Sequence, residues 1–577
     1  MYEPIADAEL SVQCRVVDHV VAYLAETGVE YIFAVDGANI EDLYDAAHFC
    51  EGITPVLAKH EFSAAAMADG YSRSGAGLGV VAATSGGGAL NLVPGLGEAL
   101  ASRVPVLALV GQPPITLDGQ GSFQDTSGCN GSLNAEALFS AVSVYCRRVK
   151  RPAEIVDALP AAIDAANRGG PAVLLLPKDV QQAHIAVGRP NVNRHRNGRP
   201  LPDGSRVDLE PVVRMLGGAG GPVAIIAGEQ VARDDARTEL EHLGEVLQAW
   251  VATAPDAKDV GSPGLGASSP LGVTGVMGHP RVAAAIGGSA LCLLVGTRLP
   301  LTARTGLADA LARVPIISMG SAPPYVACTH IHTEDLRTSL SRLAQLLTEQ
   351  SNSPSRVLVP DKTGHARLTS PSHAGARIRY SDAMAVLDAV LPDGADIVVD
   401  AGNTGAAAIH HLPVRHAGRF VVALGMGGMG YSFGAGIGMA FARRRRTVVI
   451  AGDGAFYMHG MEVHTAVQYR LPVTFVLFNN NAHAMCAIRE QLFYGDLYSY
   501  NRFRPSRLAA GLAAMFPDLR SAEVSDINEL STALDAALNL KGPSVVSVEC
   551  SADEIPPFTP FLVWAAPKVS GTQGLLP

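Results

Sequence analysis

The sequence has few aromatic residues, few cysteines and no long apolar run. Aromatic side chains make up 6% of the 577 residues, and only 8 residues are Cys. The cysteines are scattered without a C-x-x-C pair, which argues against a disulfide framework or a zinc site and favours a reducing cytoplasm. No apolar run approaches the ~18 residues needed to span a bilayer, and the acidic start MYEPIADAEL does not resemble a signal peptide. We therefore expect a cytoplasmic protein without a membrane partner.

Basic residues are also in the minority. The formal net charge is -10, which argues against nucleic acid as a partner. Hydrophobic residues reach 48%, enough for large cores. A chain of this length is expected to form two to four domains.

Short apolar segments that predict buried strands alternate with helical segments along most of the chain. Continuous apolar strands of this kind are typical of parallel sheets covered by helices on both faces. Two stretches, 186–208 and 351–378, lose the alternation and predict linkers. The sequence thus predicts an α/β fold of three doubly wound parallel-sheet domains, at 1–185, 205–350 and 375–577.

The most informative stretch, 448–485, reads as a buried strand, a Gly-Asp-Gly turn, a helix, a second buried strand and a run of Asn. Asp453 and Asn480 follow the two strands and stand 27 positions apart. In a parallel sheet such residues lie at the carboxyl edge, where ligands bind. Carboxylate and amide oxygens suit Mg²⁺, and Gly454 and Ala455 open a helix whose free N–H groups attract phosphate.

GDG followed by NN, each after an apolar run, resembles the motif that binds thiamine diphosphate (ThDP) and Mg²⁺. The alternative is an ordinary strand–turn–helix with a capping Asp. A second segment, HEFSAAAMADGYSR, resembles the H-E-x-x-A-x-x-x-A-x-G-Y-x-R block of ThDP enzymes. By itself Glu61 reads as a solvated residue in a first helical turn, where the dipole favours it. The resemblance instead implies that Glu61 contacts N1′ of the aminopyrimidine and so activates the cofactor.

Further segments extend the resemblance to nearly the whole chain, which is similar to the acetolactate synthase and pyruvate oxidase group of ThDP enzymes. GMGGMGYSFGAGIGMA resembles the segment that bends the cofactor over an aliphatic side chain, here Met429, although the family's Pro is replaced by Gly434 or Ala435. AGNT at 401–404 matches the diphosphate-binding G-Q-H segment. The resemblance implies cofactor contacts from Gly37, Asn403, Thr404, Gly427, Met429, Gly452, Asp453, Gly454, Ala455, Asn480, Ala482 and Met485. It implies metal ligation by Asp453, Asn480 and the backbone carbonyl of Ala482.

Three further side chains are candidates for contact with substrate. GSFQDT resembles the family's F-Q-E segment and places Gln124 beside the thiazolium, and PKDVQ makes Lys178 a candidate active-site cation. Arg489 stands where acetolactate synthases carry a Trp that selects a small apolar acceptor. An Arg offers five donors to oxyanions or polar groups, so we expect a larger or more polar acceptor. The alternative is an Arg that points from the helix to solvent.

The resemblance leaves FAD binding open. VTGVMGHP at 273–280 and GTRLPLTARTG at 296–306 resemble flavin-contacting segments, but the acidic turn that normally follows the next strand is absent.

We expect a ThDP- and Mg²⁺-dependent carboligase that decarboxylates a 2-oxo acid, with pyruvate the favoured donor, and transfers the acyl unit to a carbonyl acceptor. The alternatives are a decarboxylase, a flavin-dependent oxidase and a catalytically inactive ThDP-binding homologue. The resemblance also implies a homodimer or homotetramer with active sites at the subunit interface.

Overall fold

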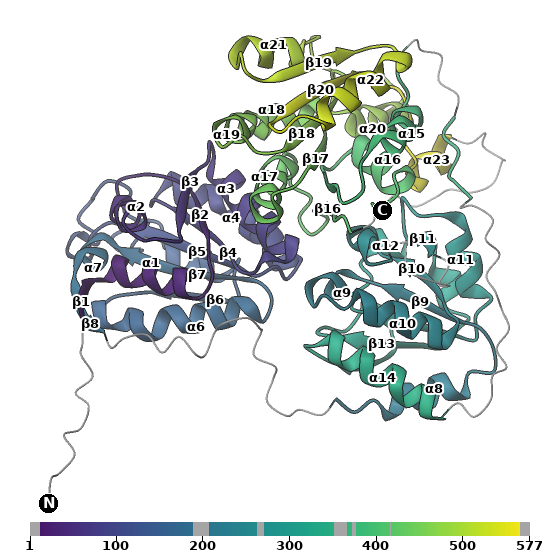
Figure 1. Cartoon of the computed structure of the whole chain (residues 1–577), viewed down its shortest axis with the longest axis horizontal. Helices are drawn as coiled ribbons and strands as arrows, with labels where there is room; N and C mark the ends of the chain where they lie inside the picture. Colours follow the sequence, from purple (N-terminus) through teal and green to yellow (C-terminus); the bar gives the residue numbers. More distant parts are fainter. Residues whose placement is uncertain are drawn as a thin grey trace, which may run out of the picture. The chain divides into compact units, whose positions relative to one another are not determined.

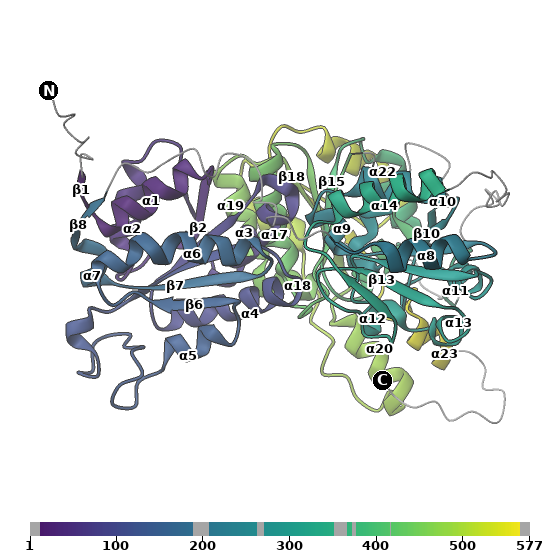
Figure 2. The same cartoon turned by 90° about the horizontal axis from the view of Figure 1, so that it is seen from below.

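The computed structural model describes residues 12–187, 207–261, 270–350, 366–371, 377–415 and 417–565. These residues form three six-stranded parallel sheets with flanking helices, and a two-stranded antiparallel pair (Figures 1 and 2). The predicted α/β fold of three parallel-sheet domains is confirmed. The two predicted linkers lie for the most part outside the described residues.

The N-terminal sheet has the strand order β3-β2-β4-β5-β7-β6. Its strands are β2 (Tyr31–Val35), β3 (Thr54–Leu57), β4 (Gly79–Ala83), β5 (Val106–Gln112), β6 (Tyr145–Arg148) and β7 (Pro171–Pro177), and β1 (Val12–Arg15) pairs with β8 (His184–Val187). Its helices are α1 (Val16–Glu26), α2 (Glu41–His48), α3 (Glu61–Tyr71), α4 (Gly87–Ala101), α5 (Ala135–Ser140), α6 (Ile155–Asn167) and α7 (Lys178–Gln182). The strands β4, β5 and β7 are buried along their whole length, as continuous apolar sequence predicts.

The central sheet has the order β11-β10-β9-β12-β13-β14. Its strands are β9 (Val223–Ala227), β10 (Trp250–Thr253), β11 (Pro270–Val273), β12 (Leu291–Val295), β13 (Ile316–Gly320) and β14 (Thr329–His332). Its helices are α8 (Glu210–Gly218), α9 (Glu229–Arg233), α10 (Arg237–Leu247), the 3₁₀ segment η5 (Pro255–Gly261), α11 (Pro280–Gly287), α12 (Leu301–Arg304), α13 (Ala308–Leu311) and α14 (Leu336–Gln350).

The C-terminal sheet has the order β16-β15-β17-β18-β20-β19. Its strands are β15 (Asp396–Val399), β16 (Phe420–Val422), β17 (Thr447–Gly452), β18 (Val473–Asn479), β19 (Arg520–Val524) and β20 (Ser544–Glu549). Its helices are α15 (Tyr380–Val390), α16 (Asn403–His411), α17 (Tyr431–Arg443), α18 (Asp453–His459), η6 (Gly460–Glu462), α19 (Val463–Gln468), α20 (Ala484–Tyr494), α21 (Leu508–Met515), α22 (Ile527–Leu538) and α23 (Thr559–Ala565).

Each sheet has a switch point where neighbouring strands send the chain in opposite directions. In the C-terminal sheet β15 leads through α16 to β16 on one side, while β17 leads through α18 to β18 on the other. The corresponding neighbours are β2 and β4 in the N-terminal sheet and β9 and β12 in the central sheet. Ligands of open parallel sheets bind at the carboxyl ends of such strands.

The chain divides into two compact units, and these do not correspond one to one to the three sheets. The first unit joins the N-terminal sheet to segments 424–443 and 461–468, and the second holds the central and C-terminal sheets. Within the first unit α17 packs directly on α3. A Cβ on Gly434 would lie 2.4 Å from the carbonyl oxygen of Ser63, and one on Gly438 would lie 1.9 Å from that of Met67. These glycines therefore allow the two helix backbones to touch.

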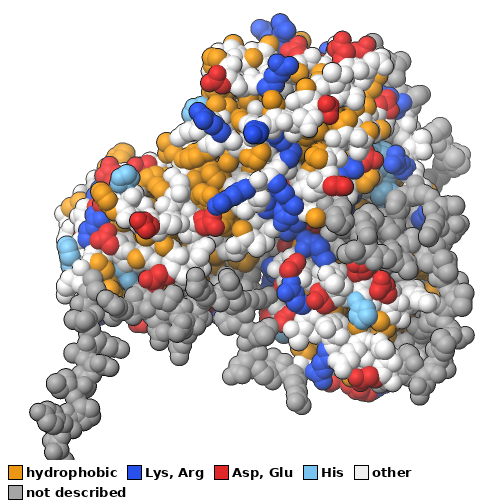
Figure 3. Space-filling model, in the orientation of Figure 1, with side chains coloured by type: hydrophobic (Ala, Val, Ile, Leu, Met, Phe, Trp, Pro, Cys, Tyr) orange, Lys and Arg blue, Asp and Glu red, His pale blue; other side chains and the backbone are white. Residues whose placement is uncertain are grey.

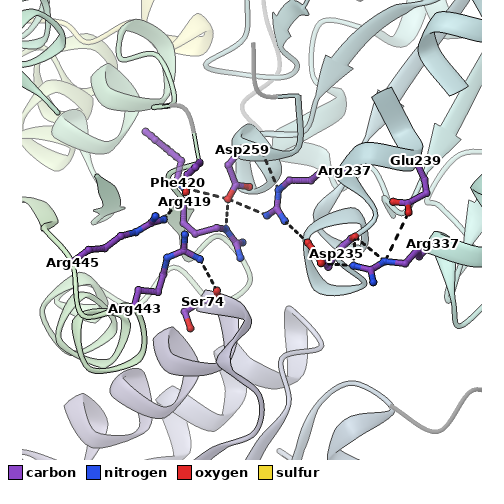
Figure 4. Close-up of polar contacts among 11 residues, drawn as sticks. Ser74, Asp235, Arg237, Glu239, Asp259, Arg337, Arg419, Phe420, Arg443 and Arg445 are labelled. Atoms are coloured by element: carbon purple, nitrogen blue, oxygen red, sulfur yellow. Dashed lines mark hydrogen bonds and ion pairs between the residues drawn. The ribbon is translucent and has the colours of Figure 1, made fainter. Parts of the chain in front are cut away.

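Within the second unit, η5 joins the central sheet to the C-terminal sheet. The buried carboxylate of Asp259 accepts hydrogen bonds from the side chain of Arg419 and from the backbone N–H of Phe420, and pairs with Arg237 at 3.4 Å (Figure 4). Burial alone would raise the pKa of Asp259, but Arg419 and Arg237 hold it below its usual value. The preceding residue, Lys258, donates to the carbonyl of Ile409 at the end of α16 at 2.6 Å.

The length of the helices and the charges on the surface can be compared with the expectation of no membrane and no nucleic-acid partner. None of the helices in the described part of the chain combines the length and apolar character needed to cross a bilayer. Figure 3 shows acidic side chains scattered among the basic ones on the face that it presents. All eight cysteines are free.

Candidate active site

Asp453 and Asn480 lie where the sequence predicts them, at the carboxyl ends of neighbouring strands. In the pairing of β17 with β18, Gly452 stands opposite Phe478. Asp453 therefore begins α18 directly after one strand, and Asn480 follows the last residue of the other. The motif brings a carboxylate and an amide to the same edge of the sheet.

Asp453 is buried, with 1% of its surface exposed to solvent. Burial raises its pKa to about 7, and backbone N–H groups of Gly454, Asn481 and Ala482 act in the opposite direction. Oδ1 accepts from the N–H of Gly454 at 2.9 Å. Oδ2 has no hydrogen-bond partner among the described residues. A buried oxygen of this kind is usually satisfied by a ligand or an ion.

The three consecutive Asn residues have different surroundings. Asn479 donates to Glu549 Oε1 at 2.9 Å and ties β18 to β20. Asn480 donates from Nδ2 to the hydroxyl of Tyr380 at 3.0 Å, and its Oδ1 accepts from the N–H of Ala482 at 2.9 Å. Asn481 has a positive φ of 55° and accepts from Ser506 N. Only the middle Asn therefore directs an amide oxygen toward the turn that contains Ala482.

The start of α16 supplies a second set of polar groups at the same switch point. Asn403 is 4% exposed, yet neither Nδ2 nor Oδ1 has a hydrogen-bond partner within the described structure. Thr404 is buried beside it, and a Cβ on Gly452 would lie 3.7 Å from Thr404 Oγ1. The start of α16 thus adjoins the GDG turn. Unpartnered buried amide atoms at a helix N-terminus fit an anion such as a diphosphate.

In the first unit, Glu61 begins α3 and is 9% exposed. Its Oε2 accepts from Asn91 Nδ2 at 3.0 Å, and a Cβ on Gly88 would lie 2.9 Å from its Oε1. His60 caps the helix, with its Nδ1 accepting from the N–H of Phe62. Because residue 88 is Gly, no side chain from this position covers Oε1.

The turn before Glu61 is held by another acid. Glu462 is 1% exposed, and its Oε1 accepts from the N–H groups of Lys59 at 2.7 Å and His60 at 3.1 Å. Burial raises its pKa, although Thr465 and these N–H groups act against the rise. Glu462 therefore fixes the backbone that presents Glu61.

Gln124 lies at the switch point of the N-terminal sheet. It has a positive φ of 60°, which is uncommon for a residue with a side chain. Its Oε1 accepts from Ser85 Oγ at 3.2 Å, and Ser85 in turn accepts from Asn39 Nδ2 at 2.6 Å. Gly37 lies against Thr84, because a Cβ there would be 2.8 Å from Thr84 Cβ. The loop after β4 thus contacts both Gly37, which follows β2, and Gln124, which follows β5.

The loop that carries Met429 also belongs to the first unit. Its start is anchored by Glu98 of α4, which accepts from Gly425 N at 3.2 Å and from Met426 N at 2.6 Å. Gly427 has a φ of 66°, in the left-handed region that favours glycine. Met429 itself is half-buried.

The two candidate cations differ in their surroundings. Lys178 Nζ donates to the carbonyl of Ala38 at 2.5 Å and to Glu41 Oε2 at 3.0 Å, so its charge is paired beside the loop after β2. Arg489 is exposed on α20, and its guanidinium lies 5.9 Å from the centre of the Phe561 ring. In the same stretch Met485 is half-buried and Ala482 is buried.

Sequence reasoning assigned no role to Asn91, Glu462 or Tyr380. Asn91 closes the segment SGGGALN at 85–91, which resembles the S-G-P-G-x-x-N segment of the same enzymes, so its place there was a usable signal. Glu462 and Tyr380 gave none, because each contacts a residue at least 100 positions away.

Comparisons with known proteins agree with this geometry. The N-terminal TPP binding domain of thiamine pyrophosphate enzymes matches residues 14–130, their central domain matches 209–334, and their C-terminal TPP binding domain matches 400–548. The probable acetolactate synthase large subunit of Methanocaldococcus jannaschii is 26% identical over 94% of this chain and 93% of its own. Acetolactate synthase isozymes 3 and 2 of Escherichia coli are 26% and 27% identical over 92% and 93% of this chain, and 94% and 95% of their own large subunits. The chain belongs to the thiamine pyrophosphate-dependent enzymes and is similar to the acetolactate synthase large subunit over nearly its whole length.

Proposed function

We propose that this enzyme is a ThDP- and Mg²⁺-dependent carboligase that decarboxylates a 2-oxo acid, with pyruvate the favoured donor, and joins the acyl unit to a carbonyl acceptor. One observation carries the cofactor assignment. Asn403 and Asp453 hold three buried polar atoms without partners among the described residues, at the ends of the neighbouring strands β15 and β17. A diphosphate with its cation is a ligand that would satisfy all three.

In this proposal the diphosphate lies against the start of α16, where Asn403 and Thr404 donate to it. Gly452, Gly454 and Ala455 leave room at the GDG turn. The cation is bound by Asp453, Asn480 Oδ1 and the carbonyl of Ala482. Hard oxygen ligands in this number, completed by phosphate oxygens and water, suit Mg²⁺.

When bound, ThDP supplies a carbon nucleophile that adds to the keto carbon, releases CO₂ and passes the remaining acyl unit to the acceptor. Glu61 would bind N1′ of the aminopyrimidine and hold or release the proton shared with it. Asn91 keeps the Glu61 carboxylate oriented, and Gly88 keeps the space in front of it open. Met429 would support the cofactor rings, and Gly37, Gly427 and Met485 are further proposed cofactor contacts.

The donor reacts beside Gln124, whose orientation is fixed by Ser85. Lys178 is proposed to bind the carboxylate of the donor substrate, and Arg489 is proposed to bind the acceptor. The exposed position of Arg489 leaves its guanidinium accessible for a polar acceptor. Because Glu41 already pairs with Lys178, a substrate carboxylate would have to share or displace that partner.

The switch point of the central sheet is closed by direct contacts. A Cβ on Gly228 would lie 2.4 Å from Thr297 Cβ, so the loops after β9 and β12 are in contact. The buried side chain of Gln230 spans this edge, accepting from Ser321 N at 2.7 Å and donating to the carbonyl of Thr333 at 3.1 Å. A dinucleotide bound at this edge would have to displace these contacts. We therefore propose no step through FAD and favour the carboligase over the oxidase.

We further propose that the enzyme is a cytoplasmic homodimer or homotetramer, in which Glu61 of one copy serves the cofactor bound by Asp453 of another. This arrangement follows from the resemblance to the acetolactate synthase group.

Product analysis tests the reaction. Purified enzyme is incubated with pyruvate, ThDP and Mg²⁺ and a panel of carbonyl acceptors, and products are identified by mass spectrometry. A joined carbon skeleton is the expected product. Release of CO₂ with a free aldehyde alone would identify a decarboxylase, and absence of turnover with retained ThDP binding would identify an inactive homologue. Visible absorbance of oxidised flavin in the purified enzyme would contradict the assignment without FAD.

A further inference from the structure

Tyr380 is a fully buried tyrosine next to the proposed metal site, and the proposed function gives it no role. It is the first residue of α15 and is 1% exposed. Its ring lies against Phe478 of β18, with ring centres 5.7 Å apart. Phe478 stands two positions before Asn480, so the phenol reaches the end of the same strand.

The backbone of Tyr380 is anchored as firmly as its ring. The N–H of Tyr380 donates to the buried carboxylate of Glu554, at 3.1 and 3.0 Å from its two oxygens. Glu554 follows β20, the other neighbour of β18. The phenol position is thus set from two strands and a helix.

The phenol oxygen has a directed hydrogen bond and a second polar neighbour. It accepts from Asn480 Nδ2 at 3.0 Å. The thiol of Cys550, which is 0% exposed, also interacts with the phenol. A phenol that gives its proton to sulfur presents its lone pairs to the amide. The sulfur is thus available for the phenol proton, while the phenol oxygen accepts from Asn480.

The acceptor role of the phenol oxygen determines which way the Asn480 amide faces. The two ends of an Asn side chain have nearly the same shape, and the hydrogen-bond partners decide its orientation. With Nδ2 held by the phenol, Oδ1 must face the opposite side, toward Ala482 and the turn. A flipped amide would present an NH₂ group to a cation.

We propose that Tyr380, supported by the Cys550 thiol, is a positioning residue that locks the Asn480 amide with its oxygen toward the metal and so sets the affinity for the cation. The inference deepens the proposed function and rests on it. Groups that orient metal ligands typically change metal affinity by about 10- to 100-fold when they are removed.

The test measures binding of Mn²⁺, used as a spectroscopic substitute for Mg²⁺, to the whole enzyme with saturating ThDP, by electron paramagnetic resonance of the free ion. Tyr380→Phe should raise the dissociation constant of Mn²⁺ by about 10- to 100-fold. Tyr431→Phe is the matched control, because it removes an equally buried hydroxyl that bonds to Asp69 in the first unit. It should leave Mn²⁺ affinity within about twofold of wild type, since Asp69 is not a proposed ligand.

A second pair of variants keeps Tyr380 itself unchanged. Cys550→Ala removes the acceptor of the phenol proton, so the hydroxyl is free to turn toward Asn480 and the amide loses its preferred orientation. Cys550→Ser keeps an acceptor. We expect weaker Mn²⁺ binding in Cys550→Ala than in Cys550→Ser, in the same direction as Tyr380→Phe.

Equal Mn²⁺ affinity in Tyr380→Phe and Tyr431→Phe would overturn the inference while leaving the proposed function intact. Equal Mn²⁺ affinity in the two Cys550 variants would show that the thiol does not help to orient the Asn480 amide. If the wild-type enzyme binds no Mn²⁺ in the presence of ThDP, the proposed function and this inference fall together.

Discussion

The neighbours of Glu61 hold its carboxylate in place, as its proposed role in proton transfer requires. Asn91 binds Oε2, and Gly88 adjoins Oε1 where any larger residue would collide. Glu462 holds the two preceding backbone N–H groups. The carboxylate is therefore fixed without being fully covered by side chains.

Glu61→Gln should keep the shape of the site but remove the base. We expect turnover to fall by about 10²-fold or more, as loss of general acid–base catalysis does. ThDP affinity should stay within about tenfold, because the amide can still contact the pyrimidine. Steady-state kinetics and ThDP titration measure the two effects, and Glu51→Gln at an exposed loop position is the control. Near-normal turnover of Glu61→Gln would remove Glu61 from the proposed role.

Glu554 gives the stability of the enzyme a dependence on pH. Burial raises the pKa of Glu554 from 4.5 to about 7, against the effect of the Tyr380 N–H and Arg379. A raised pKa means that the folded state binds the proton more tightly. The contribution to stability is therefore fully present below pH 4.5 and is lost as the pH rises through 7.

Glu554→Gln replaces the titrating acid with a neutral amide that can still accept from the Tyr380 N–H. Relative to wild type, the variant should become more stable by on the order of 2–3 kcal/mol between pH 5 and pH 8. Denaturant unfolding at both pH values measures the difference. A stability difference that does not change with pH would show that Glu554 does not titrate in this range.

Site residues were predictable where a local sequence pattern fixes their position. Asp453 and Asn480 each follow an apolar strand, so the strand pattern placed them at one edge. Tyr380 could not be found in this way, since its contact with Asn480 joins positions 100 apart. The same holds for Glu462 and His60, which are 402 positions apart. Such pairs depend on tertiary packing that no local pattern records.

At the scale of elements, strands made of a continuous apolar run were predictable and the polar edge strands β6 and β19 were not. The buried strands β4, β5 and β18 are continuous apolar runs. The edge strands β6 (YCRR) and β19 (RSAEV) lack such runs, and their residues are mostly partly or fully exposed. An edge strand has a partner on one side only, so its sequence is less constrained to be apolar.

The η5 segment offers a test of how strongly the elements of the second unit depend on one buried ion pair. Asp259→Asn would leave Arg419 and Arg237 near a neutral amide in a buried setting. Removal of one partner from such a buried pair typically destabilises by about 3–5 kcal/mol. Asp235→Asn is the matched control, because its pair with Arg337, also drawn in Figure 4, is exposed and such surface pairs contribute about 0–1 kcal/mol.

Chemical denaturation of both variants, followed by circular dichroism, gives the two free-energy changes. If Asp259→Asn were no more destabilising than Asp235→Asn, the junction between the central and C-terminal sheets would not rely on this carboxylate.

At the scale of the whole molecule, the division into three sheets was predictable from alternating strands and helices, but the two compact units were not. Segment 424–443, which carries Met429 and α17, belongs to the unit of the N-terminal sheet. The sequence of this segment alone does not predict that position. Gly434 and Gly438 allow close packing against the backbone of α3, and this contact is known only from the structure. The predicted boundaries at 1–185, 205–350 and 375–577 stay a proposal.

The proposed assembly makes a prediction that no single chain can satisfy. Glu61→Gln and Asp453→Ala should each be nearly inactive, the second because Mg²⁺-dependent ThDP binding is lost. If one site uses Glu61 from one copy and Asp453 from another, a mixed dimer of the two variants contains one site with both residues intact. Equal mixing with free subunit exchange should then restore about a quarter of wild-type activity, since half of the dimers are mixed and each has one intact site.

The measurement is turnover after the variants are mixed at low concentration, concentrated and assayed with saturating ThDP and Mg²⁺. Mixing Glu61→Gln with wild type at the same ratios controls for dilution of active sites, because activity should change in proportion to the wild-type fraction. Activity that never rises above that of the separate variants, in samples where exchange is demonstrated, would mean that Glu61 and Asp453 of the same chain serve one cofactor.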